Sequence, residues 1–348
     1  MKPPLVVLLG ATGFVGSAVL RELSAHPIQI RAVSRRPAQI PADTRAEIEV
    51  RTVDLAERGQ MAEAVADADI VIHTVLYSAG STTWRVNDGD ADAERVNVGL
   101  VRDLVDALRK RDPSEPLVRV VFAGAASQVG PAAKAILDGT ERDRPRGEYD
   151  RQKLAAEKVL LAANAEGILK GVSIRLPTVF GYGASSTARD KGVISMMVRR
   201  ALDGQPITMW HDGTVQRDLV YVEDVARALV AASEHVEALA GQPWLLGSGH
   251  GAPLGAVFTT ISELVAEQTG NPPVPVLSVP PPDHAEEGDF RSVTIDSSAF
   301  QAVTGWSPHV QLEEALRRTV AFCASGAEGG LDVRSPGSTL ASTSTEPK

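Results

Sequence analysis

A glycine-rich turn between a strand and a helix constrains the fold of this chain more than any other feature. An apolar run at residues 5–9 leads into Gly10, Gly13 and Gly16, and apolar residues then recur at helical spacing through residue 25. Glycines permit a tight turn, and the backbone N–H groups and dipole of the following helix favour an anion. The segment therefore predicts a dinucleotide site, with an ordinary glycine-rich turn as the alternative. The predicted contacts are Gly10, Thr12, Gly13, Phe14, Val15 and Gly16.

Strand-like and helical segments alternate from residue 5 to about residue 176. Short strands rich in valine and isoleucine that alternate with amphipathic helices are typical of parallel sheets covered on both faces. The first half therefore predicts an α/β fold with a Rossmann-type, doubly wound parallel sheet. We expect strands at 5–9, 28–33, 48–53, 70–74, 118–123 and 172–175, and helices at 14–25, 58–66, 91–109 and 149–164.

The pattern becomes less regular after Pro177. Helices are predicted at 192–202, 222–237, 254–268 and 311–323, with one more sheet strand at 244–247. The proline-rich stretch 271–283 predicts no regular structure, because proline lacks a backbone donor. We therefore expect a Rossmann domain over 1–177 to which 220–250 return, a smaller C-terminal α/β substrate domain over 178–219 and 251–323, and a disordered Gly/Ser/Thr-rich tail over 324–348.

Composition is typical of soluble globular proteins, since 43% of the 348 residues are hydrophobic and 23% are charged. The net charge of −9 argues against a nucleic-acid partner, and no apolar run is long enough to span a membrane. Cys323 is the single cysteine, so no disulfide can form within the chain, and the N-terminus lacks a secretory signal. These features predict a cytoplasmic protein. The seven histidines show no metal-ligand spacing, so no metal site is predicted.

The end of the second predicted strand indicates which dinucleotide binds. NAD sites usually carry an acidic residue there for the ribose hydroxyls, whereas this chain has Ser34, Arg35 and Arg36. Guanidinium groups suit a 2′-phosphate, so NADP(H) is the predicted cofactor, with a solvated surface pair of arginines as the alternative. Asp54 and Leu55 follow the third strand and are predicted beside the adenine, although an Asp in this position is commonly a turn residue.

Tyr149 and Lys153 stand four residues apart at the start of a predicted helix, so both side chains lie on one face. The ammonium is expected to favour phenolate and lower the pKa of the phenol. The pair could then exchange a proton with a carbonyl or hydroxyl oxygen while hydride moves to or from nicotinamide. Taken alone, the spacing is common on solvated helix faces. Its place after a long loop, in a chain with a dinucleotide turn, favours catalysis.

These two motifs resemble the short-chain dehydrogenase/reductase superfamily, and the spacing of the glycines resembles its extended branch of nucleotide-sugar epimerases, dehydratases and reductases. The resemblance implies that Asn97 organises a proton relay through Lys153. It implies that the segment 174–181 lines the nicotinamide and that the segment 212–225 belongs to the substrate half. The residues implied are His73, Thr74, Val75 and Pro177 at the cofactor, Thr178 at the substrate, and Arg217 and Arg291 at a nucleotide diphosphate.

The fifth strand departs from the family pattern. The family usually has a serine or threonine hydroxyl beside the tyrosine, and counting back from Gly130 places that position on Ala125. Ser127 lies two residues on and would face the same side if the strand continued. Three alternatives stay open: Ser127 substitutes, Tyr149 acts alone, or activity is impaired.

The reaction is predicted by comparing this chain with the residues that the different enzymes of the family carry. Dehydratases of the family carry an Asp-Glu pair where this chain has Ala126 and Ser127, so dehydration is disfavoured. Residues 122–130 resemble the actinobacterial 4-ketoreductases of deoxysugar biosynthesis, which implies NADPH-dependent reduction at C4 of a dTDP-4-keto-6-deoxyhexose with Tyr149 as proton donor. The alternatives are an epimerase with retained NAD(P) and a non-catalytic NADP-binding sensor. The family also implies a homodimer through helices 91–109 and 149–164.

Overall fold

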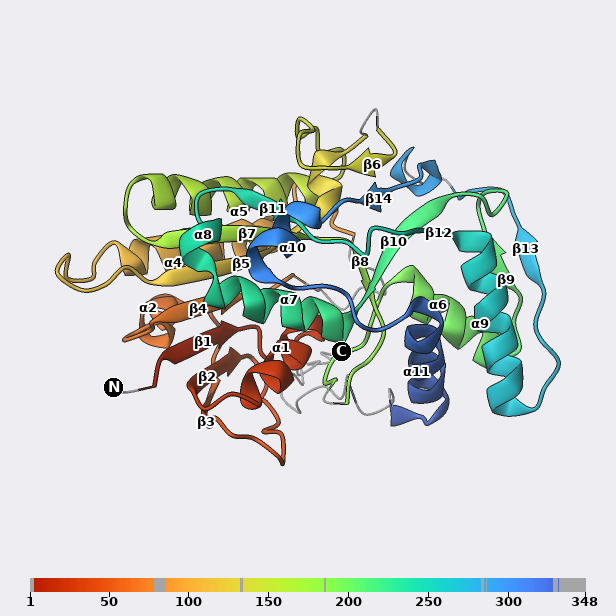
Figure 1. Ribbon diagram of the computed structural model, residues 1–348, viewed down its shortest axis with the longest axis horizontal. Helices are drawn as coiled ribbons and strands as arrows, with labels where there is room; N and C mark the ends of the chain where they lie inside the picture. Colours follow the sequence, from red (N-terminus) through yellow and green to blue (C-terminus); the bar gives the residue numbers. More distant parts are fainter. Residues whose placement is uncertain are drawn as a thin grey trace, which may run out of the picture.

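A seven-stranded parallel sheet forms the centre of the N-terminal half, in the order β11-β7-β5-β4-β1-β2-β3 (Figure 1). The computed structural model describes residues 3–77, 85–131, 134–184, 186–282, 285, 287–327 and 331. The strand order reverses beside β1, and ligands of such sheets bind at the carboxyl ends of the strands near this point. The strands are β1 Leu5–Leu9, β2 Gln29–Ser34, β3 Glu47–Thr52, β4 Ile70–His73, β5 Arg119–Ala125, β7 Lys170–Leu176 and β11 Pro243–Leu245.

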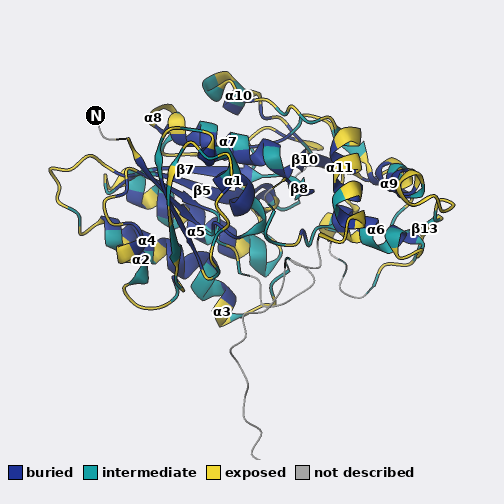
Figure 2. Cartoon of the chain, turned by 90° about the horizontal axis from the view of Figure 1, so that it is seen from below, coloured by how far each residue is buried: buried dark blue, intermediate teal, exposed yellow. Residues whose placement is uncertain are grey.

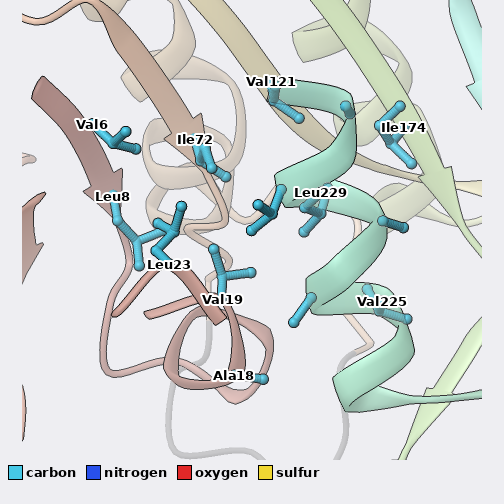
Figure 3. Packing of buried hydrophobic residues seen from close by; sticks show 14 of the residues in the cluster. Val6, Leu8, Ala18, Val19, Leu23, Ile72, Val121, Ile174, Val225 and Leu229 are labelled. Carbon is cyan, nitrogen blue, oxygen red and sulfur yellow. The ribbon is translucent and has the colours of Figure 1, made fainter. Parts of the chain in front are cut away.

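Helices cover both faces of this sheet, which explains why the central strand β1 is apolar on both sides. On one face Val6 and Leu8 of β1 pack with α1 and α7, where Val19 and Leu229 point towards the sheet (Figure 3). On the other face Val7 belongs to a second core under α2, α4 and α5. Figure 2 shows the strands buried between these layers. The helices are α1 Phe14–Ser24, α2 Gln60–Ala64, α4 Leu100–Leu108, α5 Glu148–Ala165, α7 Val222–Glu234 and the short α8 Val236–Leu239.

The C-terminal half packs around a third core, at the right of Figure 1. Three helices build it, α6 Val193–Leu202, α9 Leu254–Thr269 and α11 Leu312–Ala324, while α10 Ser298–Thr304 packs on the sheet half. A three-stranded sheet has the order β12-β10-β8, and two strand pairs are β13 with β9 and β14 with β6. These strands are β6 Ile136–Leu137, β8 Thr178–Phe180, β9 Ile207–Met209, β10 Gln216–Tyr221, β12 Gly251–Pro253, β13 Val276–Ser278 and β14 Thr294–Ile295.

Three predictions of secondary structure are wrong. The proline-rich stretch 271–283 contains β13, which pairs with β9 because its prolines flank the paired residues and Pro275 still accepts a bond from the Ile207 amide through its carbonyl. The predicted helix 91–109 is interrupted by a π turn at Arg95–Gly99, between α3 Ala91–Glu94 and α4. The predicted helix 222–237 breaks at His235 into α7 and α8.

The domain boundaries remain a prediction, although β11 joins the central sheet after the chain has passed through the other half. Most of the predicted tail 324–348, and parts of the long loops at 76–91 and 127–147, lie outside the described residues. Within the described ranges, no helix combines the length and the apolar character needed to cross a membrane.

Candidate active site

The glycine turn after β1 packs its backbone closely at the N-terminus of α1. Gly10 has φ +90°, and a side-chain Cβ there would lie 2.9 Å from Thr74 Oγ1. A Cβ on Gly16 would lie 2.0 Å from the Gly10 carbonyl oxygen, so neither position accepts a larger residue. Gly13 caps α1 without a side-chain hydrogen bond, which leaves the first amides of the helix to a ligand. The turn therefore offers the donors and the close backbone approach that a pyrophosphate would need.

The end of β4 braces this turn. Thr74 Oγ1 donates to the Leu9 carbonyl at 2.9 Å, which fixes the carboxyl ends of β1 and β4 beside each other. Val75 is partly buried against the core under α4. His73 is 1% exposed, and neither ring nitrogen has a hydrogen-bond partner among the described residues. Burial lowers the pKa of His73 to about 3, so its imidazole is neutral.

The two arginines after β2 have different surroundings. Arg36 donates from Nη1 to the Leu331 carbonyl at 2.8 Å, and from Nη2 to the carbonyls of Thr12 and Thr187, both at 3.2 Å. Arg35 is exposed, and within the described part of the chain its side chain has no hydrogen bond or ion pair. Ser34 Oγ donates to the Arg36 carbonyl at 2.7 Å and shapes the turn between them. Of the pair, Arg35 is thus the one free to meet a phosphate.

The two residues after β3 that were predicted at the adenine, Asp54 and Leu55, make contacts within the fold. Asp54 Oδ1 accepts a bond from the Ala56 amide at 2.9 Å, the turn role that an Asp after a strand commonly has. Leu55 is buried in the core under α2 and α4. Their predicted contact with adenine remains a prediction.

Lys153 lies on the second turn of α5, buried against the end of β5. Its Nζ donates to the Ala123 carbonyl at 2.7 Å and lies 4.8 Å from the centre of the Phe122 ring. The side chain reaches this point because Lys153 is on the face of α5 that packs on the sheet, where the residue is 4% exposed. Burial lowers the pKa of Lys153 to about 8.

Tyr149 lies one turn earlier, at the N-terminus of α5. Burial raises the pKa of its phenol, and the Asp150 carboxylate raises it further. The predicted lowering of this pKa by Lys153 is therefore wrong for this structure, because desolvation of the phenolate dominates. A phenol of raised pKa stays protonated near neutrality and can give its proton to a stronger base, such as an alkoxide.

Asn97 lies in the π turn and connects two segments of the site. It is 2% exposed, its Oδ1 accepts from the Tyr77 amide at 2.9 Å, and its Nδ2 donates to Gln152 Oε1 at 2.8 Å. Gln152 in turn donates to Glu148 Oε1 at 2.9 Å. Asn97 is thus bonded to the residue next to Lys153. Gln152 itself lies inside the Tyr149–Lys153 spacing, and no sequence signal distinguished it.

β5 does not continue to Ser127, so the condition under which Ser127 would face the same side as Ala125 is not met. The strand ends at Ala125 and the chain turns into a 3-10 helix at Ala126–Val129, since the Gln128 side chain accepts a bond from the Ala125 amide at 2.8 Å. Ser127 is placed instead by Asp150, whose Oδ1 accepts from Ser127 Oγ at 2.6 Å. Ser127 therefore lies beside the first turn of α5 for a reason other than strand alternation.

Arg217 and Arg291, the predicted diphosphate contacts, lie together at a 3-10 turn, Glu287–Phe290. Arg217 donates to the Arg291 carbonyl and, at 2.8 and 3.0 Å, to the carbonyls of Gly288 and Asp289. Burial lowers the pKa of its guanidinium, and the Asp289 carboxylate offsets part of that shift. Arg291 forms an ion pair with Glu287.

Two further predicted residues lie where the N-terminal half gives way to the C-terminal half. Pro177 joins β7 to β8, and Thr178 opens β8, where it pairs with Leu219 of β10. Both residues are half-buried. Their predicted contacts with cofactor and substrate remain predictions.

A buried ion network, missed from the sequence, anchors α5 to the sheet. Arg175 of β7 donates to Glu157 of α5 at 2.5 and 3.0 Å, and to both oxygens of Asp143 at 2.7 and 2.8 Å. Ser173 Oγ donates to the same Glu157 carboxylate at 2.6 Å. The network fixes the helix that carries Tyr149 and Lys153.

Comparisons with known proteins agree on one family. The family described as NAD dependent epimerase/dehydratase matches residues 6–247. Two similar proteins are a dTDP-L-rhamnose 4-epimerase of Burkholderia thailandensis, 27% identical over 89% of this chain and 92% of its own, and a dTDP-6-deoxy-L-talose 4-dehydrogenase (NAD(P)(+)) of Kitasatospora kifunensis, 28% identical over 90% and 94%. A solved structure, MoeE5 in complex with UDP-glucose and NAD, has a TM-score of 0.75 and 27% identity, covering 93% of this chain and 99% of that one.

Proposed function

This chain belongs to the NAD dependent epimerase/dehydratase family, within the extended short-chain dehydrogenases/reductases, and on that premise we propose that it reduces the C4 keto group of a dTDP-4-keto-6-deoxyhexose with NADPH. The observation that carries the proposal is the end of β2, where Arg35 is exposed and unpaired within the described residues. An arginine in place of an acidic residue favours a 2′-phosphate. NADPH is exchanged in each cycle, as a net reduction requires.

Tyr149 is the proposed proton donor. The bound cofactor supplies hydride, and the C4 oxygen becomes an alkoxide that must be protonated. The raised pKa of the Tyr149 phenol keeps its proton available for that oxygen. Lys153, held at the Ala123 carbonyl, would bind the nicotinamide ribose, and Asn97 would position α5 through Gln152.

The proposed substrate class rests on the relatives and on the arginines of the C-terminal half. The two relatives named above carry dTDP in their names, whereas the MoeE5 structure holds UDP-glucose. Arg217 and Arg291 lie together and would hold the diphosphate, once the carbonyls and the carboxylate that they now bind give way. The proposed assembly is a homodimer through α4 and α5, between which a shallow groove with Val105 and Val159 in its lining lies at the surface.

An epimerase with a retained cofactor is the second candidate, supported by the Burkholderia relative's name and by the NAD in the MoeE5 structure. A non-catalytic NADP-binding sensor is the third, supported by Ala125 in place of the usual hydroxyl. The reductase consumes NADPH. The epimerase interconverts two sugars without consuming cofactor, and the sensor does neither.

The experiment that tests the proposal follows NADPH absorbance with a panel of dTDP-4-keto-6-deoxyhexoses and identifies products by mass spectrometry. Reductase activity that Tyr149→Phe abolishes supports the proposal. Cofactor released from the denatured protein is identified in parallel, since bound NAD with sugar interconversion supports the epimerase. No NADPH oxidation with any sugar of the panel contradicts the proposed reaction.

A further inference from the structure

Lys153 is a buried cation with few partners. Its ammonium has one hydrogen bond, to the Ala123 carbonyl, and forms no ion pair with any carboxylate in the described residues. The remaining contact is the face of the Phe122 ring, 4.8 Å from Nζ to the ring centre. An aromatic face attracts a cation through its quadrupole, and the attraction is strongest where water is excluded.

The Phe122 ring is itself held in place from the neighbouring strand. His73 of β4 pairs in register with Phe122 of β5, and the two rings meet edge to face with 5.6 Å between their centres and 60° between their planes. Both residues are 1% exposed. Because His73 is neutral, it adds no positive charge beneath Lys153. The imidazole therefore contacts the phenyl ring, and the phenyl ring contacts the ammonium.

We propose that Phe122 is a positioning residue whose ring face, braced by His73, holds the Lys153 ammonium where it meets the cofactor. The inference rests on the proposed function in assigning Lys153 to the cofactor ribose. A leucine at residue 122 would fill most of the same volume without the negative ring face. Lys153 would then keep a single carbonyl contact in a site that excludes water, and its ammonium would lose both stability and a fixed position.

A double-mutant cycle on NADPH affinity tests whether Phe122 acts through Lys153. Phe122→Leu and Lys153→Met are each expected to weaken binding by roughly tenfold, and the double variant to bind no more weakly than Lys153→Met alone. Phe300→Leu is the matched control, since Phe300 is also 1% exposed but packs on Trp306 in the core on the opposite face of the sheet from Phe122. Its NADPH affinity should equal that of the wild type.

Fluorinated phenylalanines at residue 122 keep the ring shape and withdraw charge from its face, so they test the same contact without a cavity. NADPH affinity should fall stepwise from phenylalanine to pentafluorophenylalanine. Equal affinity across this series, or an additive loss in the Phe122→Leu/Lys153→Met double variant, overturns the inference.

A cofactor-independent measurement separates this inference from the proposed function. In protein labelled at the lysine ε-carbon, the Lys153 methylene resonance should show an upfield ring-current shift that Phe122→Leu removes. A wild type that binds neither NADPH nor NADH contradicts the proposed function, while the NMR shift still supports the contact. A Lys153 resonance without that shift overturns the inference whatever the protein binds.

Discussion

Ser127 donates its hydroxyl hydrogen to the Asp150 carboxylate, with 2.6 Å between Oγ and Oδ1. The bond joins the turn after β5 to the first turn of α5, one residue beyond Tyr149. A hydrogen held by a carboxylate is a poor donor to a substrate oxygen, because turning away would cost a charge-assisted bond. Ser127 is thus held at the first turn of α5, and we expect it to be a weaker substitute for the hydroxyl that Ala125 lacks.

Ser127→Ala is therefore expected to lower kcat by less than about tenfold, whereas Tyr149→Phe lowers it by about 100-fold or more. Steady-state assays of the two variants with NADPH and the same sugar make the comparison. A loss in Ser127→Ala as large as that in Tyr149→Phe would mean that Ser127 leaves Asp150 and donates to the substrate.

Ala125→Ser should restore the missing hydroxyl and raise kcat severalfold, since a second donor would then stabilise the developing alkoxide. An unchanged kcat in a folded Ala125→Ser protein would show that Tyr149 needs no such partner.

Arg35→Asp is expected to reduce the preference for NADPH over NADH by roughly tenfold or more, because a carboxylate repels the 2′-phosphate. Arg36→Gln should weaken both cofactors alike, since Arg36 already binds three carbonyls. Dissociation constants from fluorescence titration measure both ratios. If Arg36→Gln changed the NADPH/NADH preference and Arg35→Asp did not, Arg36 rather than Arg35 would be the residue that meets the 2′-phosphate.

Lys153→Met should make the free protein more stable at pH 7, by about 1–3 kcal/mol, because burial lowers the pKa of Lys153 from 10.5 to about 8. Between pH 8 and 10.5 the unfolded chain binds more protons than the folded one, so wild-type stability rises with pH in that window. Urea unfolding at several pH values should show that the difference in unfolding free energy between Lys153→Met and wild type shrinks as the pH rises from 8 to 10.5. A difference independent of pH would contradict the buried charge.

Glu157→Ala is expected to cost about 3–5 kcal/mol of unfolding free energy, since it leaves the Arg175 guanidinium without its buried partner. Asp143→Ala should cost less, because that side chain is 26% exposed. Glu166→Ala is the surface control, where the ion pair with Arg109 is about half exposed and contributes below about 1 kcal/mol. Equal losses of unfolding free energy in Glu157→Ala and Glu166→Ala would contradict the expectation that the buried ion pair contributes more than the exposed one.

Much of the sheet could be predicted, because strands buried on both faces are almost wholly apolar, as residues 5–9 are and as residues 118–123 are apart from Arg119. The glycine turn was predictable because its signal, three glycines between an apolar strand and a helix, lies within seven consecutive residues. The short strands of the C-terminal half were not, because three residues carry too little periodicity to distinguish a strand from a loop.

Among the site residues, those with a local signal were predictable and those whose contacts depend on the fold were not. The Tyr149 and Lys153 spacing is local and is placed on one helix face as predicted. The partners of Arg36 lie at Thr12, Thr187 and Leu331, and only the folded chain brings them together. The pKa of Tyr149 was misjudged because burial, which dominates it, depends on the whole fold.

The π turn at Arg95–Gly99 gives the site a dependence on chain length. Such a turn holds one more residue than an α-helix needs, and each residue of an α-helix rotates the following side chains by about 100°. After the loss of one residue there, α4 could keep its packing on the sheet only if Asn97 rotated away from Gln152. A single-codon deletion in this segment should therefore disconnect Asn97 from α5 more completely than many substitutions, while most of the α4 packing is preserved.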